Sequence, residues 1–212
     1  MKIQTLPVGA FESNCYILES GDASLIIDPG ADADRILHEL KGPPVAFLLT
    51  HGHIDHLSAL PQLCAAWPEV PVYLHAADLA WAFGPLNGLP PYYEALGRPP
   101  EQARALPELR WSAGPFAFEI LSTPGHSPGG VCFYDEKALA LFTGDTLFEG
   151  TVGRTDLPVS DARALSDSLL QLARLPPETN VHPGHGNATT IGRELKNNFF
   201  LAAAARRNTA GG

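Results

Sequence analysis

The first thirty residues contain three short apolar runs separated by turn-forming residues, which predicts a β-meander. These runs lie at residues 2–8, 14–18 and 24–28, with a turn at residues 19–22. A continuous apolar run at residues 45–49 is bounded by proline and polar residues, so it predicts a fully buried strand. Further strands are predicted at 70–74, 116–121, 131–134, 138–143 and 179–181.

Apolar residues with helical spacing lie between these strands. The clearest case is residues 160–175, where leucines recur on one face and Ser160 is expected to cap the N-terminus. Residues 84–107 are rich in proline, glycine and aromatic residues and lack periodicity, which favours a long connecting loop. Strands that alternate with helices favour an α/β fold. The other helices are predicted at 32–40, 57–67, 76–83 and 190–206.

Length and composition indicate one large domain, although 212 residues would also allow two small ones. Hydrophobic residues make up 45% of the chain, which is enough for a substantial core. We expect a single domain over residues 1–207 and a disordered tail over residues 208–212.

The net charge and the cysteine content indicate which classes of partner and which cellular compartment to expect. The net charge of −9 argues against a nucleic-acid partner. No apolar stretch approaches the roughly 20 residues that cross a bilayer, and the N-terminus enters a strand pattern at once, so we expect neither a membrane partner nor a signal peptide. Three scattered cysteines, each expected to be a small buried residue, fit a reducing compartment. The chain is therefore expected to be cytoplasmic.

The segment Thr50-His51-Gly52-His53-Ile54-Asp55-His56 carries the most specific chemistry. It follows the buried strand at 45–49, and α/β folds place functional groups on loops that leave the carboxyl ends of strands. His51 and His53 alternate, so an extended loop would project both side chains to the same side. Asp55 and His56 are offset from them and can reach a second ion. Imidazole and carboxylate groups together suit a divalent metal such as zinc, manganese or iron.

Three more candidate ligands follow predicted strands in the same way. His126 lies in the sequence Thr-Pro-Gly-His-Ser-Pro-Gly, Asp145 in Thr-Gly-Asp, and His185 in Pro-Gly-His-Gly. Each is flanked by glycine or proline, which fix an irregular backbone. Four strand ends that carry such residues indicate one shared metal site.

The order HxHxDH, TPGHSPG, TGD and PGHG resembles the metallo-β-lactamase superfamily, and within it the glyoxalase II-like (hydroxyacylglutathione hydrolase-like) branch. The motifs extend from about Asp28 to His185. The resemblance implies a four-layer αβ/βα sandwich of two mixed β-sheets with helices on the outer faces. It also implies two divalent metal ions per chain, with zinc expected first and iron or manganese as alternatives.

The resemblance further implies a division of the ligands between the two ions. His51, His53 and His126 would bind the first ion. Asp55, His56 and His185 would bind the second ion. Asp145 would bridge the two, and Asp28 would support the site without binding metal.

Several other residues are candidates for support or substrate contact. Ser127 is expected to hydrogen-bond near His126, and His182 to pack behind the site, where the family pattern usually has an apolar or aromatic residue. For Arg154 we favour an ion pair that holds its loop, with contact to an anionic substrate as the alternative. Tyr92, Tyr93 and Arg98 lie in the long loop and are weaker candidates for substrate contact.

The resemblance favours a hydrolase that cleaves a thioester, S-lactoylglutathione or a related acyl-thiol, by attack of a metal-bridging hydroxide. Asp55 and Asp145 would be the catalytic carboxylates. A thiol has a pKa of only about 8.5, so the leaving group needs no strong general acid. Longer glyoxalase II enzymes carry a C-terminal helical region that contributes to glutathione binding, and most of it is missing here. We therefore expect a small-molecule thioester as substrate, and the motifs do not specify which thiol carries the acyl group.

Three alternatives remain. A persulfide dioxygenase-like protein would hold a single iron with His51, His126 and Asp145. A lactonase would use both metals on an oxygen ester, and a non-catalytic protein would only bind or sense metal. A homodimer is also possible, through a patch expected at Trp81, Phe83, Tyr92 and Tyr93.

Overall fold

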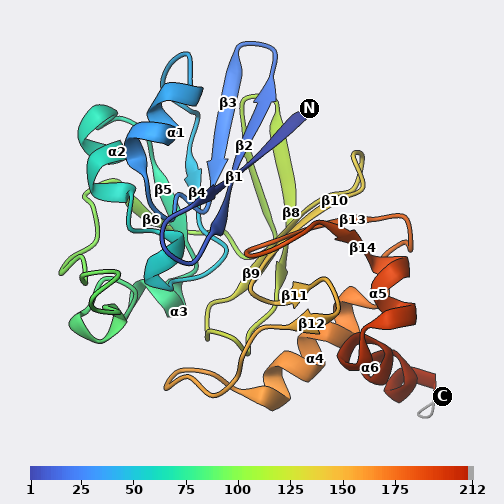
Figure 1. Cartoon of the computed structure of the whole chain (residues 1–212). Coiled ribbons are helices and arrows are strands. Elements are labelled where there is room, and N and C mark those ends of the chain that lie inside the picture. Colours follow the sequence, from blue (N-terminus) through green and yellow to red (C-terminus); the bar gives the residue numbers. More distant parts are fainter. Residues whose placement is uncertain (210–212) are drawn as a thin grey trace.

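The computed structural model describes residues 1–209 and shows two six-stranded β-sheets packed face to face, with helices on their outer faces (Figure 1). This is the four-layer αβ/βα sandwich expected from the sequence. The last helix continues through Thr209. Residues 210–212 of the expected tail lie outside the described residues.

The first sheet comes from the N-terminal half and has the strand order β1-β2-β3-β4-β5-β6. Its first three strands form the expected antiparallel meander. The strands from β3 to β6 are parallel, so their carboxyl ends lie at one edge. The strands are β1 (Lys2–Val8), β2 (Ser13–Ser20), β3 (Ala23–Ile27), β4 (Phe47–Leu48), β5 (Val72–Leu74) and β6 (Ala103–Ala105).

Short helices connect the parallel strands of the first sheet. The α1 helix follows β3, η1 and α2 follow β4, and α3 and η2 follow β5. Their bounds are α1 (Ala33–Glu39), η1 (Ile54–His56), α2 (Leu60–Ala66), α3 (Ala76–Leu79) and η2 (Pro85–Asn87).

The second sheet has the order β14-β13-β10-β9-β8-β7. The strands from β7 to β10 are antiparallel, β13 lies parallel to β10, and β14 is antiparallel to β13. Its strands are β7 (Arg110–Ala113), β8 (Phe116–Ser122), β9 (Val131–Asp135), β10 (Ala140–Gly144), β13 (Asn180–Pro183) and β14 (Thr189–Thr190). The remaining elements are the hairpin β11 (Leu147–Phe148) and β12 (Thr151–Val152), and helices α4 (Ala162–Leu172), α5 (Ile191–Asn197) and α6 (Phe199–Thr209).

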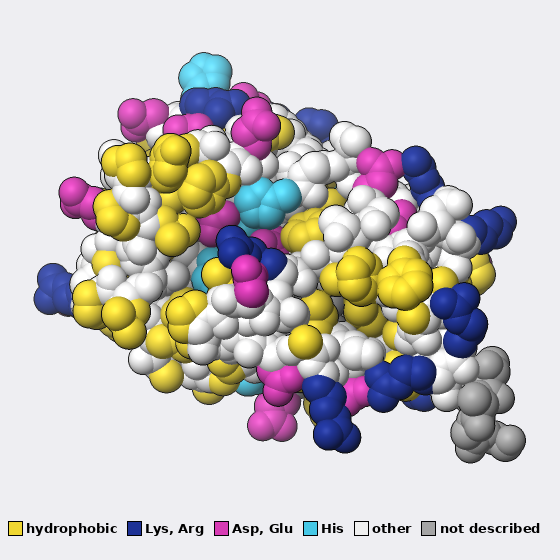
Figure 2. All heavy atoms as spheres, turned by 60° about the horizontal axis from the view of Figure 1, so that its bottom comes forward, with side chains coloured by type: hydrophobic (Ala, Val, Ile, Leu, Met, Phe, Trp, Pro, Cys, Tyr) yellow, Lys and Arg dark blue, Asp and Glu magenta, His cyan; other side chains and the backbone are white. Residues whose placement is uncertain are grey.

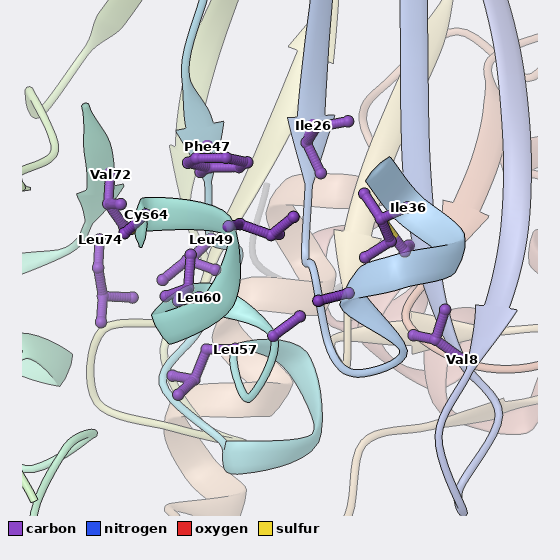
Figure 3. Close-up of a cluster of buried hydrophobic side chains, with 14 of the residues drawn as sticks. Val8, Ile26, Ile36, Phe47, Leu49, Leu57, Leu60, Cys64, Val72 and Leu74 are labelled. Carbon is purple, nitrogen blue, oxygen red and sulfur yellow. The ribbon is translucent and has the colours of Figure 1, made fainter. Parts of the chain in front are cut away.

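Buried apolar side chains fill the three spaces between the four layers. One cluster, which includes Phe133, lies between the two sheets. A second joins the first sheet to α1 and α2 through side chains such as Ile36 and Leu60 (Figure 3). A third joins the second sheet to α4, α5 and α6 and includes Leu169 and Leu201. Each fully buried side chain of this size stabilises the fold by roughly 1.5–3 kcal/mol, so the sheets form a rigid support for the loops at their edges.

The predicted cap of α4 is wrong by one residue. Asp161, not Ser160, is the N-cap, and its Oδ1 accepts hydrogen bonds from the backbone N–H groups of Arg163 and Ala164. The Ser160 hydroxyl instead donates to the carbonyl oxygen of Leu157 in the preceding turn. Both residue types favour N-caps, so composition alone did not separate them.

The single helix predicted at residues 190–206 is two helices in the structure. Asn198 is extended (φ −91°, ψ 113°) and ends α5. Its Oδ1 accepts hydrogen bonds from the N–H groups of Phe200 and Leu201, so the same residue begins α6. An asparagine whose side chain satisfies free backbone donors stops a helix that the apolar spacing would continue.

The long connection at residues 84–107 is more ordered than expected, because it contains η2 and the edge strand β6. The patch proposed for a dimer is not exposed as one surface. Phe83 and Tyr93 are buried, Trp81 is partly buried, and only Tyr92 is well exposed, at 61%.

The three cysteines are free and buried, as predicted. Among residues 1–209, no helix combines the length and the apolar character needed to cross a membrane.

Candidate metal centre

Five strand ends meet at one edge of the sandwich and bring the predicted ligands together. Asp28 follows β3, the HxHxDH segment follows β4, and His126, Asp145 and His185 follow β8, β10 and β13. Figure 2 looks onto this face, and histidine and acidic side chains lie together near its middle. The first sheet supplies the HxHxDH residues and the second sheet supplies the other three, so the centre lies across the space between the sheets.

Among residues 1–209, three groups of three residues bring possible metal-ligand atoms close together; two of them contain predicted ligands alone, and the third, Asp28, His51 and His56, includes the supporting Asp28. Within each set, the donor atoms lie within 4.8 Å of one another. The first set is His51, His53 and His126, and the second set is Asp55, His56 and His185. These are the two sets that the family resemblance implied.

In the first set, hydrogen bonds hold two of the rings so that Nε2 faces the centre. The Thr50 hydroxyl donates to Asp28 (2.6 Å) and therefore accepts from Nδ1–H of His51 (3.0 Å). Nδ1–H of His126 donates to the carbonyl oxygen of Arg154 at 2.9 Å. A carbonyl oxygen can only accept, so the proton lies on Nδ1 and the lone pair of Nε2 is free to bind a metal.

The second set is oriented in the same way. Nδ1–H of His56 donates to Oδ2 of Asp28 at 3.2 Å, and Nδ1–H of His185 donates to the carbonyl oxygen of Phe11 at 3.0 Å. The two Nε2 atoms are 3.2 Å apart, and Oδ2 of Asp55 lies 3.3 Å from that of His185 and 3.6 Å from that of His56.

Asp145 lies between the two sets. Its Oδ2 is 3.4 Å from Nε2 of His126, and its Oδ1 is 3.4 Å from Nε2 of His56. Oδ2 is also 3.6 Å from Nε2 of His185, so the carboxylate lies between the two sets, where a bridging ligand would lie.

Unpaired atoms provide an independent test of whether these residues fit a metal. Nε2 of His51, Nδ1 of His53 and Oδ1 of Asp145 are buried without a hydrogen-bond partner. A buried polar atom without a partner costs on the order of 1–3 kcal/mol, so three of them at one point need an explanation. All three belong to the candidate ligands, and a coordinated cation would satisfy each of them.

The two sets differ in how their histidines titrate. Burial, and then the nearby His56, lower the pKa of His51 well below its ordinary value. Burial, and then the nearby His126, lower the pKa of His53 to about 3. Both rings are neutral at pH 7, which is the form that binds a metal.

In the second set, nearby carboxylates raise the pKa values of the histidines. Burial alone would lower the pKa of His56, but Asp55 and Asp145 outweigh it and raise that pKa to about 10. Burial also opposes the change at His185, whose hydrogen bond to Asp55 and proximity to Asp145 raise its pKa. The carboxylates therefore favour positive charge here, whether protons or a metal ion carry it.

Asp28 occupies the supporting position expected for it. Its oxygens accept hydrogen bonds from the N–H and hydroxyl groups of Thr50 and from His56, so it holds both sets from behind. Ser127 donates to Oδ2 of Asp78 at 2.6 Å. His182 stacks on Phe142, with ring centroids 5.0 Å apart, and therefore packs between strands behind the site.

The loop that carries His185 is held by a strand of the other sheet. Nδ2 of Asn14 donates to the carbonyl oxygens of Pro183 and Gly186, both at 3.0 Å, and the Tyr16 hydroxyl donates to that of Pro183 at 2.6 Å. A methyl group on Gly184 would collide with Oδ1 of Asp145 and with Cε1 of His56, so only glycine fits there.

No sequence motif points to Asn14, Tyr16 or Asp78, because their partners lie far away along the chain. Asp78 carries the one signal that a sequence offers: it is the only Asp, Glu, Lys or Arg between Glu69 and Glu94. A lone charge in such a segment is either solvated or buried with partners, and here it is fully buried.

The candidate substrate contacts lie in different surroundings. Tyr93 is buried and its hydroxyl accepts a hydrogen bond from the N–H of Ala10, so it supports the β1–β2 turn. Tyr92 is exposed and packs against Phe11, with ring centroids 5.2 Å apart. Arg98 is exposed on the same connection.

Arg154 makes the ion pair favoured from the sequence. Its guanidinium makes two hydrogen bonds to Asp156, at 2.7 and 2.9 Å. Its backbone carbonyl is the acceptor for His126, a contribution that a sequence does not show.

Comparisons with known proteins agree with this geometry. The sequence model of the Metallo-beta-lactamase superfamily matches residues 8–185. The chain is 40% identical to "Probable metallo-hydrolase YqgX" of Bacillus subtilis over 95% of its length and 98% of that protein. It is 36% identical to "Hydroxyacylglutathione hydrolase GloC" of Haemophilus influenzae, again over 95% and 98%.

Solved structures show the same fold. The BLEG-1 B3 metallo-beta-lactamase superimposes with a TM-score of 0.87 at 37% identity, over 94% of this chain and 99% of that one. TTHA1623 in a di-iron-bound form gives 0.81 at 42% identity, over 93% and 99%. ETHE1 from Myxococcus xanthus gives 0.74 at 25% identity, over 98% and 92%. Together with the metal-ligand arrangement, these matches show that the chain belongs to the metallo-β-lactamase superfamily.

Proposed function

We propose that this protein is a binuclear metallohydrolase that cleaves a thioester, with hydroxyacylglutathione-type acyl-thiols as the first substrate class to test. The observation that carries the proposal is the second ligand set. Asp55, His56 and His185 are grouped as closely as the first set. Asp145 faces both sets, with one oxygen 3.4 Å from a histidine of each.

Two divalent ions at these positions, with zinc expected first and iron or manganese as alternatives, would supply a water-derived nucleophile at neutral pH and a Lewis acid for the carbonyl group. Asp145 would fix the separation of the two ligand sets. Asp55 would complete the second set and orient the nucleophile through its carboxylate. A thiolate leaves without a strong acid, so the centre needs no further proton donor for a thioester.

The length of a related protein supports glutathione as a carrier. Longer enzymes of the glyoxalase II-like branch use an additional helical region for glutathione, so the length of a relative named for glutathione bears on the carrier. The Haemophilus influenzae protein named a hydroxyacylglutathione hydrolase is matched over 98% of its own length, so it too is short.

Tyr92 and Arg154 are the substrate contacts that the geometry favours most. Tyr92 lies against Phe11, whose carbonyl oxygen holds His185. The backbone carbonyl of Arg154 accepts the hydrogen bond of His126 at 2.9 Å, so this residue lies beside the first set. Arg98, exposed on the same connection as Tyr92, remains a candidate.

Metal analysis is the first test. We expect about two ions per chain after purification without a metal-affinity tag, and about one after His185→Ala. His38→Ala, at an exposed position on α1, is the matched control and should keep both ions. One ion in the wild-type protein, unchanged by His185→Ala, would exclude the binuclear proposal.

A panel of matched substrates then tests the reaction. We expect hydrolysis of S-lactoylglutathione or another hydroxyacyl thioester to exceed that of the corresponding oxygen ester by orders of magnitude. A lactone or a β-lactam cleaved faster than every thioester would overturn the thioester assignment while leaving the hydrolase intact.

A single-iron persulfide dioxygenase is the second candidate, because two histidines and one carboxylate of this centre could hold one iron without the second set. His51, His126 and Asp145 would hold its iron, and Nε2 of His126 does lie 3.4 Å from Asp145. Oxygen uptake with a glutathione persulfide, unaffected by His185→Ala, would favour this reading over the hydrolase.

A further inference from the structure

Asp78 is a fully buried carboxylate on α3 that lies outside both ligand sets. Each of its oxygens accepts two hydrogen bonds. Oδ2 accepts from the N–H of Gly52 (2.8 Å) and the hydroxyl of Ser127 (2.6 Å). Oδ1 accepts from the N–H of Gly129 (2.6 Å) and Nε1 of Trp81 (3.1 Å). Four hydrogen bonds offset the cost of burying this charge, so the surrounding fold is arranged to hold a carboxylate here.

Three of the four donors come from the loops that carry the first ligand set. Gly52 lies between His51 and His53 on the loop after β4, in the first sheet. Ser127 and Gly129 follow His126 on the loop after β8, in the second sheet. Asp78 is therefore a direct link between two ligand loops that are more than 70 residues apart.

The two ligand loops pack so closely against Asp78 that they have little room to move relative to it. A methyl group on Gly129 would lie 2.8 Å from the Asp78 carboxylate, and one on Gly52 would lie 3.1 Å from its Cβ. Trp81, held by Oδ1, packs its ring against His53 with centroids 5.2 Å apart. Asp78 is thus linked to His51 and His53 through the backbone of Gly52. It is linked to the loop of His126 through the Ser127 hydroxyl and the backbone of Gly129, and to His53 a second time through the ring of Trp81.

We propose that Asp78 is a positioning residue: it sets the spacing of His51, His53 and His126 and thereby the affinity of the first ion. This inference rests on the proposed metal centre and not on the identity of the substrate. Residues that orient metal ligands typically change metal affinity 10- to 100-fold when they are replaced.

Asp78→Asn is the most informative variant, because the donors dictate how the amide must turn. With the NH₂ group at the Oδ1 position it would face two groups that can only donate, the N–H of Gly129 and Nε1 of Trp81. At the Oδ2 position it can donate to the Ser127 hydroxyl, and only the bond from Gly52 is lost. The variant therefore releases the HxHxDH loop while the other three bonds remain.

The experiment measures metal affinity by chelator competition in two single-site backgrounds. With His185→Ala, which leaves the first set intact, Asp78→Asn should weaken binding of Zn²⁺ about 10- to 100-fold. With His53→Ala, which leaves the second set, the same change should alter affinity less than about twofold. Ser127→Ala removes one hydrogen bond to the same carboxylate and should also lower the affinity of the first site for Zn²⁺. This second variant keeps the test decisive if Asp78→Asn fails to fold.

Glu194→Gln is the matched control. Glu194 is also a buried carboxylate with hydrogen bonds from three residues, Gly150, Thr189 and Asn198, and it lies away from the ligand sets. We expect Glu194→Gln to lower the melting temperature without changing the affinity of either site. If Asp78→Asn and Ser127→Ala behave like this control, Asp78 is only structural and the proposal is wrong.

The result separates this proposal from the proposed function. A wild-type protein that binds two ions but cleaves no thioester overturns the reaction, and the affinity test of Asp78 still stands. A wild-type protein that binds Zn²⁺ at neither set overturns both.

Discussion

At the scale of single residues, hydrogen bonds to ring nitrogens decide which atom of each histidine faces the centre. The Nδ1–H groups of His126 and His185 donate to backbone carbonyls, those of Arg154 and Phe11. Nδ1–H of His56 donates directly to Asp28, and Nδ1–H of His51 donates to the Thr50 hydroxyl, which in turn donates to Asp28. The sequence predicts the imidazoles by motif but not these acceptors, because backbone carbonyls carry no residue-specific signal.

Thr50→Val tests this orientation. The variant keeps the shape of the side chain but removes the hydroxyl that links His51 to Asp28, so a buried donor and a buried acceptor lose their partner. We expect a loss of about 1–3 kcal/mol in the free energy of unfolding and a clear loss of metal occupancy. Thr189→Val removes a comparable buried hydroxyl, which donates to Glu194 at 2.7 Å, and should lower stability alone. Equal metal contents in the two variants would contradict this account of His51.

His182→Phe tests the role of the ring that stacks on Phe142. Burial lowers the pKa of His182 to about 4 from an ordinary value of 6.5. Between these values the unfolded chain binds a proton that the folded protein does not, so stability falls as the pH drops from 6.5 towards 4. The slope from this group is at most about 1.4 kcal/mol per pH unit.

Phenylalanine can keep the stacking and does not titrate, so the variant should lose less stability than the wild type between pH 7 and pH 5. Denaturant unfolding of both proteins at the two pH values measures the difference. An identical pH dependence would show that the pKa of His182 is the same in the folded and the unfolded state, so that burial does not lower it.

At the scale of elements, the apolar periodicity located the strands and helices that build the core, and it failed where side-chain hydrogen bonds set the ends. The continuous pattern at residues 190–206 gives no sign that Asn198 caps a second helix. The edge strand β6 has three residues, none of them fully buried, so it lacks the pattern by which strands are recognised. Short edge elements depend on pairing with a neighbour, which a single sequence does not contain.

The N-cap of α4 is a quantitative test at this scale. Asp161→Ala removes the acceptor for two backbone N–H groups and should lower the free energy of unfolding by about 1 kcal/mol. Ser160→Ala, one residue earlier, should change it by clearly less, because its hydroxyl bonds only to Leu157. Chemical denaturation of the two variants compares them directly, and the reverse order of effects would restore the cap expected from the sequence.

At the scale of the whole molecule, the candidate ligands were predictable because each follows a strand, and strand ends of a sandwich converge. Asp78 and Asn14 were not, since both act across the gap between the sheets on loops that are distant in sequence. The motif thus reveals the chemistry, and the fold reveals the residues that hold its geometry.

The same convergence predicts that metal removal loosens the contact between the two halves. His51, His53, Asp55 and His56 come from the first sheet, and the other ligands come from the second, so bound ions would link the sheets. A ligand present at 100 times its dissociation constant stabilises the folded state by about 2.7 kcal/mol for each site. We therefore expect a chelator to lower the melting temperature by several degrees and added Zn²⁺ to restore it.

The His185→Ala variant separates this link from a general effect of metal on the chain. It keeps the first set, in which His51 and His53 belong to one sheet and His126 to the other, so one ion can still join the sheets. Its metal-dependent shift in melting temperature should be about half that of the wild type, while His38→Ala should keep the full shift. A wild-type melting temperature that is the same with and without chelator would contradict the prediction, because it would show that bound metal does not stabilise the contact between the two sheets.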